Sequence, residues 1–136
     1  KNLFFGNKLE KQKMVELERI SKLVGIYEFQ NKLARNLSYG QKRLVGIARA
    51  ILNYPKVLVL DEPVAGVIPL LRNRISKILL ELKKQGETIL LIEHDMNFTL
   101  KIADSVVVVD EGKVIAKGTP SEVKRNKKVL EAYLGE

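Results

Sequence analysis

Two adjacent carboxylates follow a short apolar run near the middle of the sequence. Val57–Leu60 is wholly apolar and is followed directly by Asp61 and Glu62. Such a run is typical of a buried parallel strand, and open parallel sheets bind ligands at the carboxyl ends of their strands. There, one carboxylate can hold Mg²⁺ on a phosphate, usually through water, and the next can accept a proton from an attacking water. The pair therefore indicates phosphate chemistry, and a strand that merely ends in a polar turn is the alternative.

A second candidate site opens a predicted helix. Within Leu37–Gln41, Ser38 and Gln41 have the spacing of a capping box, which leaves the first amides of the helix pointing outward. Such a helix end attracts an anion through its N–H groups and its dipole, and Gly40 would let a phosphate approach the backbone closely. A capped helix start with a glycine also occurs for structural reasons alone, so this site by itself supports either interpretation.

The single histidine of the sequence follows another apolar run. Glu93, His94 and Asp95 come directly after Thr88–Ile92, which we interpret as a second buried strand. A lone histidine at a strand end is commonly a structural residue. Its place one strand further along the same predicted sheet nevertheless makes His94 a candidate to reach a γ-phosphate or the bound water.

The elements that must position these residues fall into two parts, which meet at about Leu52–Pro55. In the first part, apolar residues recur at helical spacing between Lys and Glu. They form one stripe of Met14, Leu17, Ile20 and Val24, ended by Gly25, and a second stripe of Leu44, Ile47, Ala48 and Ile51 in a helix from about Tyr39 to Leu52. We therefore place a domain boundary between residues 54 and 55.

Strands and helices alternate in the second part, residues 55–136. Between the two apolar runs lies a helical stripe of Leu71, Ile75, Ile78, Leu79 and Leu82, which ends before Gly86. The later elements are a short helix at Asn97–Ala103, a hairpin of Val106–Val109 and Val114–Ala116 around Glu111-Gly112, and a capped helix start at Thr119–Glu122. This alternation predicts an α/β fold with a mainly parallel sheet and flanking helices.

The composition bounds the functional classes. The chain has 136 residues, no cysteine and one histidine, which excludes disulfides, thiolate metal sites and multi-histidine centres and favours an intracellular compartment. The net charge of +8 can mark a nucleic-acid or membrane-surface partner. Lys-rich solvated helix faces explain it better, because no interleaving of Arg with aromatic residues occurs. A basic cluster of Lys124, Arg125, Lys127 and Lys128 is expected on a surface helix.

In this order and spacing, the three candidate sites resemble those of the ATP-binding subunits of ABC transporters. Leu37–Gln41 is similar to the family signature L-S-G-G-Q, with Tyr39 in place of the first Gly. Val57–Pro63 resembles the Walker B motif with its catalytic glutamate, and His94 the switch histidine. The resemblance implies a P-loop NTPase (RecA-like) fold, with part of the ABC helical subdomain in residues 1–54 and the C-terminal part of the ATPase core in residues 55–136.

The resemblance also implies a role for each candidate residue. Two such domains sandwich two ATP molecules head to tail, so Ser38, Tyr39, Gly40 and Gln41 of one subunit would meet the γ-phosphate of ATP held by the other. Asp61 would serve Mg²⁺ through water, Glu62 the attacking water, and His94 the γ-phosphate. The implied partners are a second ATP-binding subunit and membrane permease subunits, with no nucleic acid. The implied location is cytoplasmic, on the cytoplasmic face of the membrane.

Within the ABC family, several segments are most similar to the subunits that drive branched-chain amino-acid uptake. These segments are Ser38–Gly40, Leu91–Met96 and Ala132–Glu136. Lipopolysaccharide-export ATPases have a similar tail, so the transported molecule stays open. An ABC-type ATPase of DNA repair or translation is the next alternative, and a non-catalytic interaction domain that keeps the fold is a third.

The sequence departs from the family pattern in two places. It contains no G-x-x-x-x-G-K-[ST] phosphate loop, and Lys1–Gly6 resembles the segment after the family's Q-loop. We therefore expect a fragment that is inactive alone and that self-associates through uncovered strands. In the D-loop, Ala65–Pro69, Ile68 stands where the family has a polar residue that helps to couple the two ATP sites. Weakened coupling and neutral drift are both compatible with this change.

Overall fold

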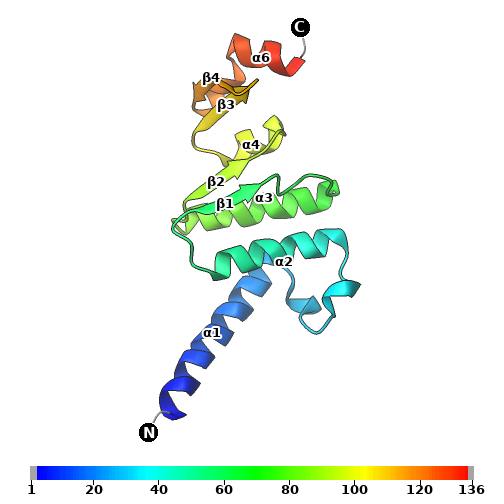
Figure 1. Cartoon of the computed structure of the whole chain (residues 1–136), viewed down its shortest axis with the longest axis vertical. Helices are drawn as coiled ribbons and strands as arrows, with labels where there is room; N and C mark the ends of the chain where they lie inside the picture. Colours follow the sequence, from blue (N-terminus) through cyan, green and yellow to red (C-terminus); the bar gives the residue numbers. More distant parts are fainter. Residues whose placement is uncertain (1–2, 135–136) are drawn as a thin grey trace. The chain divides into compact units, whose positions relative to one another are not determined.

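The computed structural model describes residues 3–134, which form two compact units (Figure 1). One unit ends at Ile92 and the other begins at Glu93, and each has its own two-stranded sheet. The predicted boundary at residues 54 and 55 lies inside the first unit. That boundary separates subdomains of the ABC family and stays a prediction.

The first unit is mainly helical. In chain order its elements are α1 (Leu3–Val24), the 3-10 turns η1 (Tyr27–Phe29) and η2 (Ala34–Asn36), α2 (Tyr39–Leu52), β1 (Leu58–Asp61), α3 (Pro69–Lys84) and β2 (Ile89–Ile92). The bounds of α2 agree with the predicted helix. The two 3-10 turns were not predicted, because a three-residue element has too little periodicity to be recognised.

Gly25 ends α1, as the sequence predicts. Its φ of +73° lies in the left-handed region, which glycine enters without steric cost. A β-carbon at this position would lie 1.3 Å from Nη2 of Arg74 in α3. The left-handed turn is therefore the reason for glycine here, because the end of the flexible Arg74 side chain could move to make room for a β-carbon.

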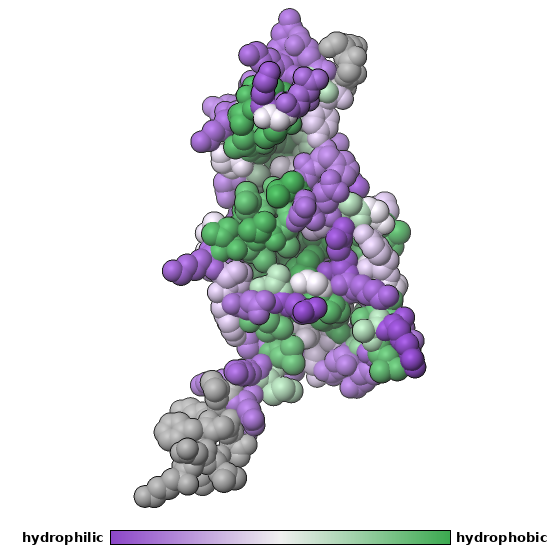
Figure 2. Space-filling view, viewed as in Figure 1, coloured by the Kyte–Doolittle hydropathy of each residue, from purple (hydrophilic) through white to green (hydrophobic). Residues whose placement is uncertain are grey.

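The strands β1 and β2 pair in parallel, with Val59 opposite Leu90. Successive residues of a strand point to opposite faces of the sheet. Leu58 and Leu60 are buried, so one face of the sheet belongs to the core. The other face, called the exposed sheet face below, is apolar (Figure 2). It consists of Val57, Val59, Leu90 and Ile92, each of them 46–55% exposed.

The core of the first unit combines residues from α1, α2, β1 and α3. Its members are Ile20, Val24, Leu44, Ile47, Ala48, Ile51, Leu58, Leu60, Ile75, Ile78, Leu79 and Leu82. The predicted apolar stripe of α2 is confirmed, and that of α3 is buried from Ile75 onward. The stripe predicted for α1 is buried only from Ile20 onward. Met14 and Leu17 are exposed, because they line an open cavity instead of packing against a neighbouring helix.

The second unit contains a hairpin and three short helices among its described residues. Its elements are α4 (Met96–Ile102), β3 (Val106–Asp110), β4 (Lys113–Gly118), α5 (Pro120–Lys124) and α6 (Lys127–Leu134). Ala116, Val123 and Val129 are buried together, so the hairpin, α5 and α6 share one small core. The predicted basic cluster does not lie on one helix, because Arg125 ends α5 and Lys127 begins α6.

The turn of this hairpin is the one that the sequence predicts. Glu111 and Gly112 connect β3 to β4 and have φ angles of 45° and 75°. A two-residue hairpin loop of type I′ requires positive φ at both positions, which matches these values. The predicted capping box at Thr119 and Glu122 is also present at the start of α5. The parallel β1–β2 pair and the antiparallel hairpin together give an α/β fold.

Candidate functional site

The start of α2 has the capping box that the sequence predicts. The backbone N–H of Gln41 donates to Oγ of Ser38 at 3.2 Å, and the N–H of Ser38 donates to Oε1 of Gln41 at 2.9 Å. Helical geometry gives the N–H groups of Tyr39 and Gly40 no acceptor within the helix. Two outward N–H groups at the positive end of a helix dipole suit a phosphate oxygen. The residues therefore fit the anion that the sequence predicts at this point.

Gly40 also has a packing reason to lack a side chain. A β-carbon there would lie 2.4 Å from Cδ2 of Leu71 in the first turn of α3. The glycine thus lets the start of α2 lie close to the start of α3. Because the contact is with the end of a flexible side chain, a larger residue could be accommodated by moving Leu71. The structure accordingly supports both interpretations of this glycine.

The two carboxylates lie at the carboxyl end of β1, as predicted. Asp61 is the last residue of the strand and stands opposite Ile92 in the parallel register. Glu62 follows with φ 44°, a left-handed conformation that is uncommon for a residue other than glycine. Its N–H donates to the carbonyl oxygen of Ile92 at 2.9 Å, which continues the ladder one residue beyond the strand.

The carbonyl oxygen of Glu62 is held by two further contacts. It accepts a hydrogen bond from Nη2 of Arg43 in α2 at 2.9 Å and one from the N–H of Ala65 at 3.2 Å. The Arg43 guanidinium also lies over the ring of Tyr39, 5.7 Å from its centroid. A contact of this kind between a cation and an aromatic face is attractive. Backbone and side-chain contacts together fix the peptide on both sides of Glu62.

A cavity of about 390 Å³ joins the start of α2 to the end of β1. Its lining residues are Tyr39, Lys42, Arg43, Gly46, Ile47, Leu60, Asp61 and Pro63. The structure therefore brings one predicted phosphate-binding residue, Tyr39, and the predicted magnesium ligand, Asp61, to the same cavity. Two basic side chains line it as well, which favours an anionic ligand.

His94 lies in the loop between β2 and α4 and belongs to the second unit. Its carbonyl oxygen accepts a hydrogen bond from the hydroxyl of Tyr133 in α6. Next to it, Oδ1 of Asp95 caps α4 by accepting from the N–H of Phe98 at 2.9 Å. Burial raises the pKa of the Tyr133 hydroxyl, and the charges of Asp95 and Glu93 raise it further. The loop that carries His94 is thus fixed from α4 and from α6.

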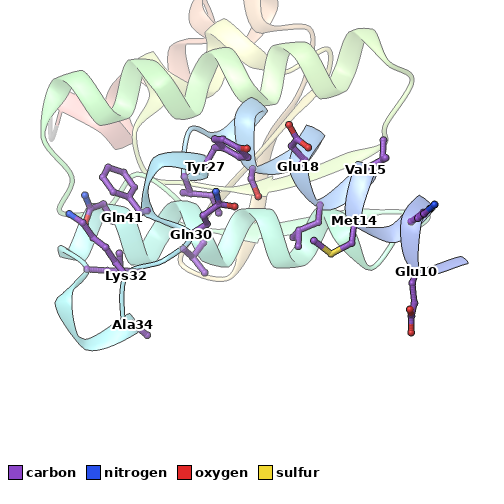
Figure 3. A pocket seen from close by; sticks show the side chains of 16 residues that line it. Glu10, Met14, Val15, Glu18, Tyr27, Gln30, Lys32, Ala34 and Gln41 are labelled. Carbon is purple, nitrogen blue, oxygen red and sulfur yellow. The ribbon is translucent and has the colours of Figure 1, made fainter. Parts of the chain in front are cut away.

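A larger cavity of about 920 Å³ lies between α1, the two 3-10 turns and α2 (Figure 3). The residues that line it include Met14, Tyr27, Gln30, Lys32 and Gln41. Gln41 is thus shared between the capping box and this cavity. The predicted catalytic residues do not line it, so it is separate from the site of the carboxylates.

Asp61 is the predicted metal ligand. Among residues 3–134, no group of three or more His, Asp or Glu side chains is arranged to hold a metal ion. Magnesium commonly keeps several waters and takes one or two carboxylates together with substrate phosphates. A single carboxylate at a strand end therefore fits Mg²⁺ on a nucleotide, which is the arrangement that the sequence predicts.

The D-loop residue Ile68 occupies the N-cap position of α3. Its side chain makes no capping hydrogen bond and is 66% exposed, and Pro69 follows as the first helical residue. Asp or Asn at an N-cap accepts a hydrogen bond from an amide of the first turn, whereas Ile cannot. The departure from the family pattern thus removes a helix cap as well as a polar D-loop side chain.

Replacing Ile68 by Asp should stabilise the protein. The new carboxylate can cap α3, and the expected gain in the free energy of unfolding is about 1 kcal/mol. Ile68→Ala is the matched control, since it removes the exposed apolar side chain without supplying a cap. Chemical denaturation of the three proteins measures the effect, and equal stability of the Asp and Ala variants would contradict it.

Ile68→Asp also tests the two explanations for the departure from the family pattern. In the longer protein that contains this chain, a higher ATPase rate or Hill coefficient of Ile68→Asp would favour weakened coupling in the present sequence, and unchanged kinetics would favour drift.

Two models of known families match the chain. Residues 2–65 match the model described as ABC transporter, and residues 113–136 match the model described as branched-chain amino acid ATP-binding cassette transporter. The first match includes both the capping box at Ser38 and the carboxylates that follow β1. Both models describe ABC transporters, which confirms the resemblance to their ATP-binding subunits.

Individual ABC proteins agree with this assignment. The high-affinity branched-chain amino acid transport ATP-binding protein LivG of Salmonella typhimurium is 44% identical over 121 residues, which are 88% of this chain and 46% of LivG. The L-cystine import ATP-binding protein TcyN of Bacillus subtilis is 39% identical over 127 residues, 93% of this chain and 49% of TcyN. The chain spans about half the length of these relatives.

The fold agrees with solved ABC structures. The crystal structure of the ADP conformation of an ATP-binding cassette from an ABC transporter matches with a TM-score of 0.79 at 36% identity. The match covers 92% of this chain and 51% of that structure's chain. The predicted P-loop NTPase fold is therefore confirmed.

Sequence reasoning missed two residues that contact the candidate site residues, Arg43 at Glu62 and Tyr133 at His94. Arg43 was not singled out, although it stands four residues after Tyr39, at the spacing of neighbours on a helix face. Tyr133 was noted only as part of a tail, of which Gly135 and Glu136 lie outside the described residues. Its partner His94 is 39 residues away, and no local pattern indicates a contact at that separation.

Proposed function

We propose that the longer protein containing this chain, called the parent protein below, is the ATP-hydrolysing subunit of a transporter for branched-chain amino acids. The proposal rests on one observation above all. The capped start of α2 and the carboxyl end of β1 share a cavity, in a chain that matches the ABC transporter model. The phosphate loop, which has no counterpart in this sequence, would come from the rest of the parent protein.

Each residue of the site has a separate task in this proposal. The outward amides of Tyr39 and Gly40, together with Ser38 and Gln41, bind the γ-phosphate of ATP held by a second subunit. Bound Mg²⁺ supplies charge neutralisation on the phosphates, and Asp61 holds it through water. Glu62 orients or deprotonates the attacking water, and His94 contacts the γ-phosphate.

The proposal requires two kinds of protein partner. A second ATP-binding subunit completes each ATP site by presenting its own α2 start to the ATP bound by the first subunit. Membrane permease subunits supply the transport path, and they hold the parent protein on the cytoplasmic face of the membrane. In residues 3–134, no helix combines the length and the apolar composition that crossing a bilayer requires.

The substrate class rests on the C-terminal family match at residues 113–136 and on the similarity to LivG. Similarity over most of the chain does not by itself decide the substrate class, because TcyN is also similar over 93% of the chain and is named for L-cystine import. The hypothesis is therefore tested best by transport, with the parent protein and its permease subunits reconstituted in vesicles.

We expect ATP-dependent uptake of leucine, isoleucine and valine and none of cystine. Uptake of cystine alone would refute the proposed substrate class and leave the proposed ATPase activity standing. ATP hydrolysis that responds to lipopolysaccharide, or to DNA or RNA, would favour the export or nucleic-acid alternatives instead. A parent protein that contains the phosphate loop but hydrolyses no ATP would refute the proposed activity itself.

A further inference from the structure

The backbone of Glu62 is held in a conformation that its residue type disfavours. Its φ of 44° persists only where the surroundings enforce it, and residues of this kind are common at active sites. Two of the enforcing contacts are hydrogen bonds between backbone groups. The N–H of Glu62 donates to the carbonyl oxygen of Ile92, and the carbonyl oxygen of Glu62 accepts from the N–H of Ala65. A further contact is the hydrogen bond of 2.9 Å from the Arg43 guanidinium, which comes from a different element, α2.

Arg43 is itself oriented by the start of α2. Its guanidinium lies over the ring of Tyr39, one helical turn earlier, and Tyr39 stands where the ABC signature has a glycine. An aromatic ring in this place gives the guanidinium a flat surface on which to lie, whereas glycine would give none. A chain of two contacts therefore leads from the first residue of α2 through Arg43 to the backbone of Glu62.

Stability alone explains this arrangement poorly. Nε of Arg43 is buried and has no hydrogen-bond acceptor within residues 3–134. A buried donor without an acceptor is destabilising, and its presence in a native structure calls for an explanation. The guanidinium is placed so that it reaches the carbonyl of Glu62.

We propose that Arg43 is a positioning residue that links the two ATP sites through the backbone of Glu62. The inference rests on the proposed function, in which α2 begins at the γ-phosphate of the partner's ATP and Glu62 acts on ATP held by its own subunit. Phosphate bound at Ser38 fixes the start of α2, and Arg43 transmits that position to Glu62. The link runs within one subunit and bypasses the D-loop, where Ile68 lacks the polar side chain of the family.

The decisive test is a double-mutant cycle in the parent protein. Loss of a hydrogen bond from a charged donor should lower kcat in Arg43→Ala by about tenfold, with KM for ATP little changed. In a Glu62→Gln background, Arg43→Ala should not lower kcat any further. A residue that acts only by positioning the Glu62 carboxylate has no effect on kcat once that carboxylate is gone. Arg49→Ala is the matched control, since it removes an exposed positive charge from the same helix, α2, at a residue that does not line the cavity.

Cooperativity tests the link between the two sites separately. We expect the Hill coefficient for ATP to fall toward one in Arg43→Ala and to stay unchanged in Arg49→Ala. A normal kcat in Arg43→Ala, or an equal loss in both backgrounds, would overturn the positioning role. A lowered kcat with an unchanged Hill coefficient would overturn the link. If Arg43→Ala does not fold, Arg43→Lys replaces it, because Lys keeps the charge but lacks the planar fork that reaches the carbonyl.

These outcomes stay distinct from failure of the proposed function. If Glu62→Gln hydrolyses ATP at the normal rate, Glu62 is not the catalytic base and the proposed function fails first. If Glu62→Gln is impaired and Arg43→Ala is normal, the proposed function stands and only the role of Arg43 is refuted.

Discussion

Glu62→Gln should lower the ATPase rate of the parent protein by roughly 10²-fold or more, because the amide cannot accept the proton of the attacking water. ATP binding should be preserved, since amide and carboxylate have the same shape. The contacts of Glu62 with Ile92, Arg43 and Ala65 are all made by its backbone, so the substitution leaves them in place.

The matched control is Glu111→Gln. Glu111 has a φ of 45°, close to the 44° of Glu62, but it lies in the turn between β3 and β4. Any general effect of changing Glu to Gln at a left-handed position would appear in both variants. Steady-state ATPase assays and equilibrium ATP binding measure the two effects separately. A Glu62→Gln rate near that of the wild type would remove Glu62 from the role of catalytic base.

Local patterns predicted the elements that carry the site. The start of α2 follows from the spacing of Ser38 and Gln41, and its end follows from the apolar stripe that reaches Ile51. The hairpin turn follows from Glu111-Gly112, because few residue pairs adopt positive φ at both positions. In each case the determining interactions lie within a few residues of one another. For these elements, the local sequence is sufficient to predict the structure.

Contacts between distant residues explain what the sequence could not predict. The left-handed φ of Glu62 depends on Arg43, which precedes it by 19 residues, and on β2. Helical spacing places Met14 on the same stripe as Ile20, but burial depends on which neighbour covers each turn of α1. Periodicity identifies a face of an element and does not identify what packs against it.

The exposed sheet face is the largest departure from an ordinary α/β arrangement. Parallel sheets are normally covered on both faces, yet Val57, Val59, Leu90 and Ile92 are 46–55% exposed in this chain. Both β1 and β2 also lie at edges of their two-stranded sheet. Exposed apolar residues on edge strands form a template for pairing with another chain. In a purified sample the available partner is a second copy of the chain.

The 136-residue polypeptide alone should therefore self-associate and bind ATP far more weakly than the parent protein. Without a phosphate loop it lacks the lysine and amides that hold the β- and γ-phosphates. Losing two charge-assisted hydrogen bonds of about 1.5–3 kcal/mol each weakens binding by about 10²-fold or more. The carboxylates at the end of β1 and the amides at the start of α2 remain, but they do not replace those donors.

Calorimetric titration with Mg-ATP and light scattering over a range of concentrations test the two parts separately. Val59→Asp places a charge on the exposed sheet face and should reduce association. Val15→Asp makes the same change at an exposed residue that belongs to α1 and not to the sheet, so it should not reduce association. A wild-type polypeptide that stays monomeric at high concentration would contradict the association. Binding of Mg-ATP with the affinity of the parent protein would show instead that α2 and β1 hold the nucleotide without the loop.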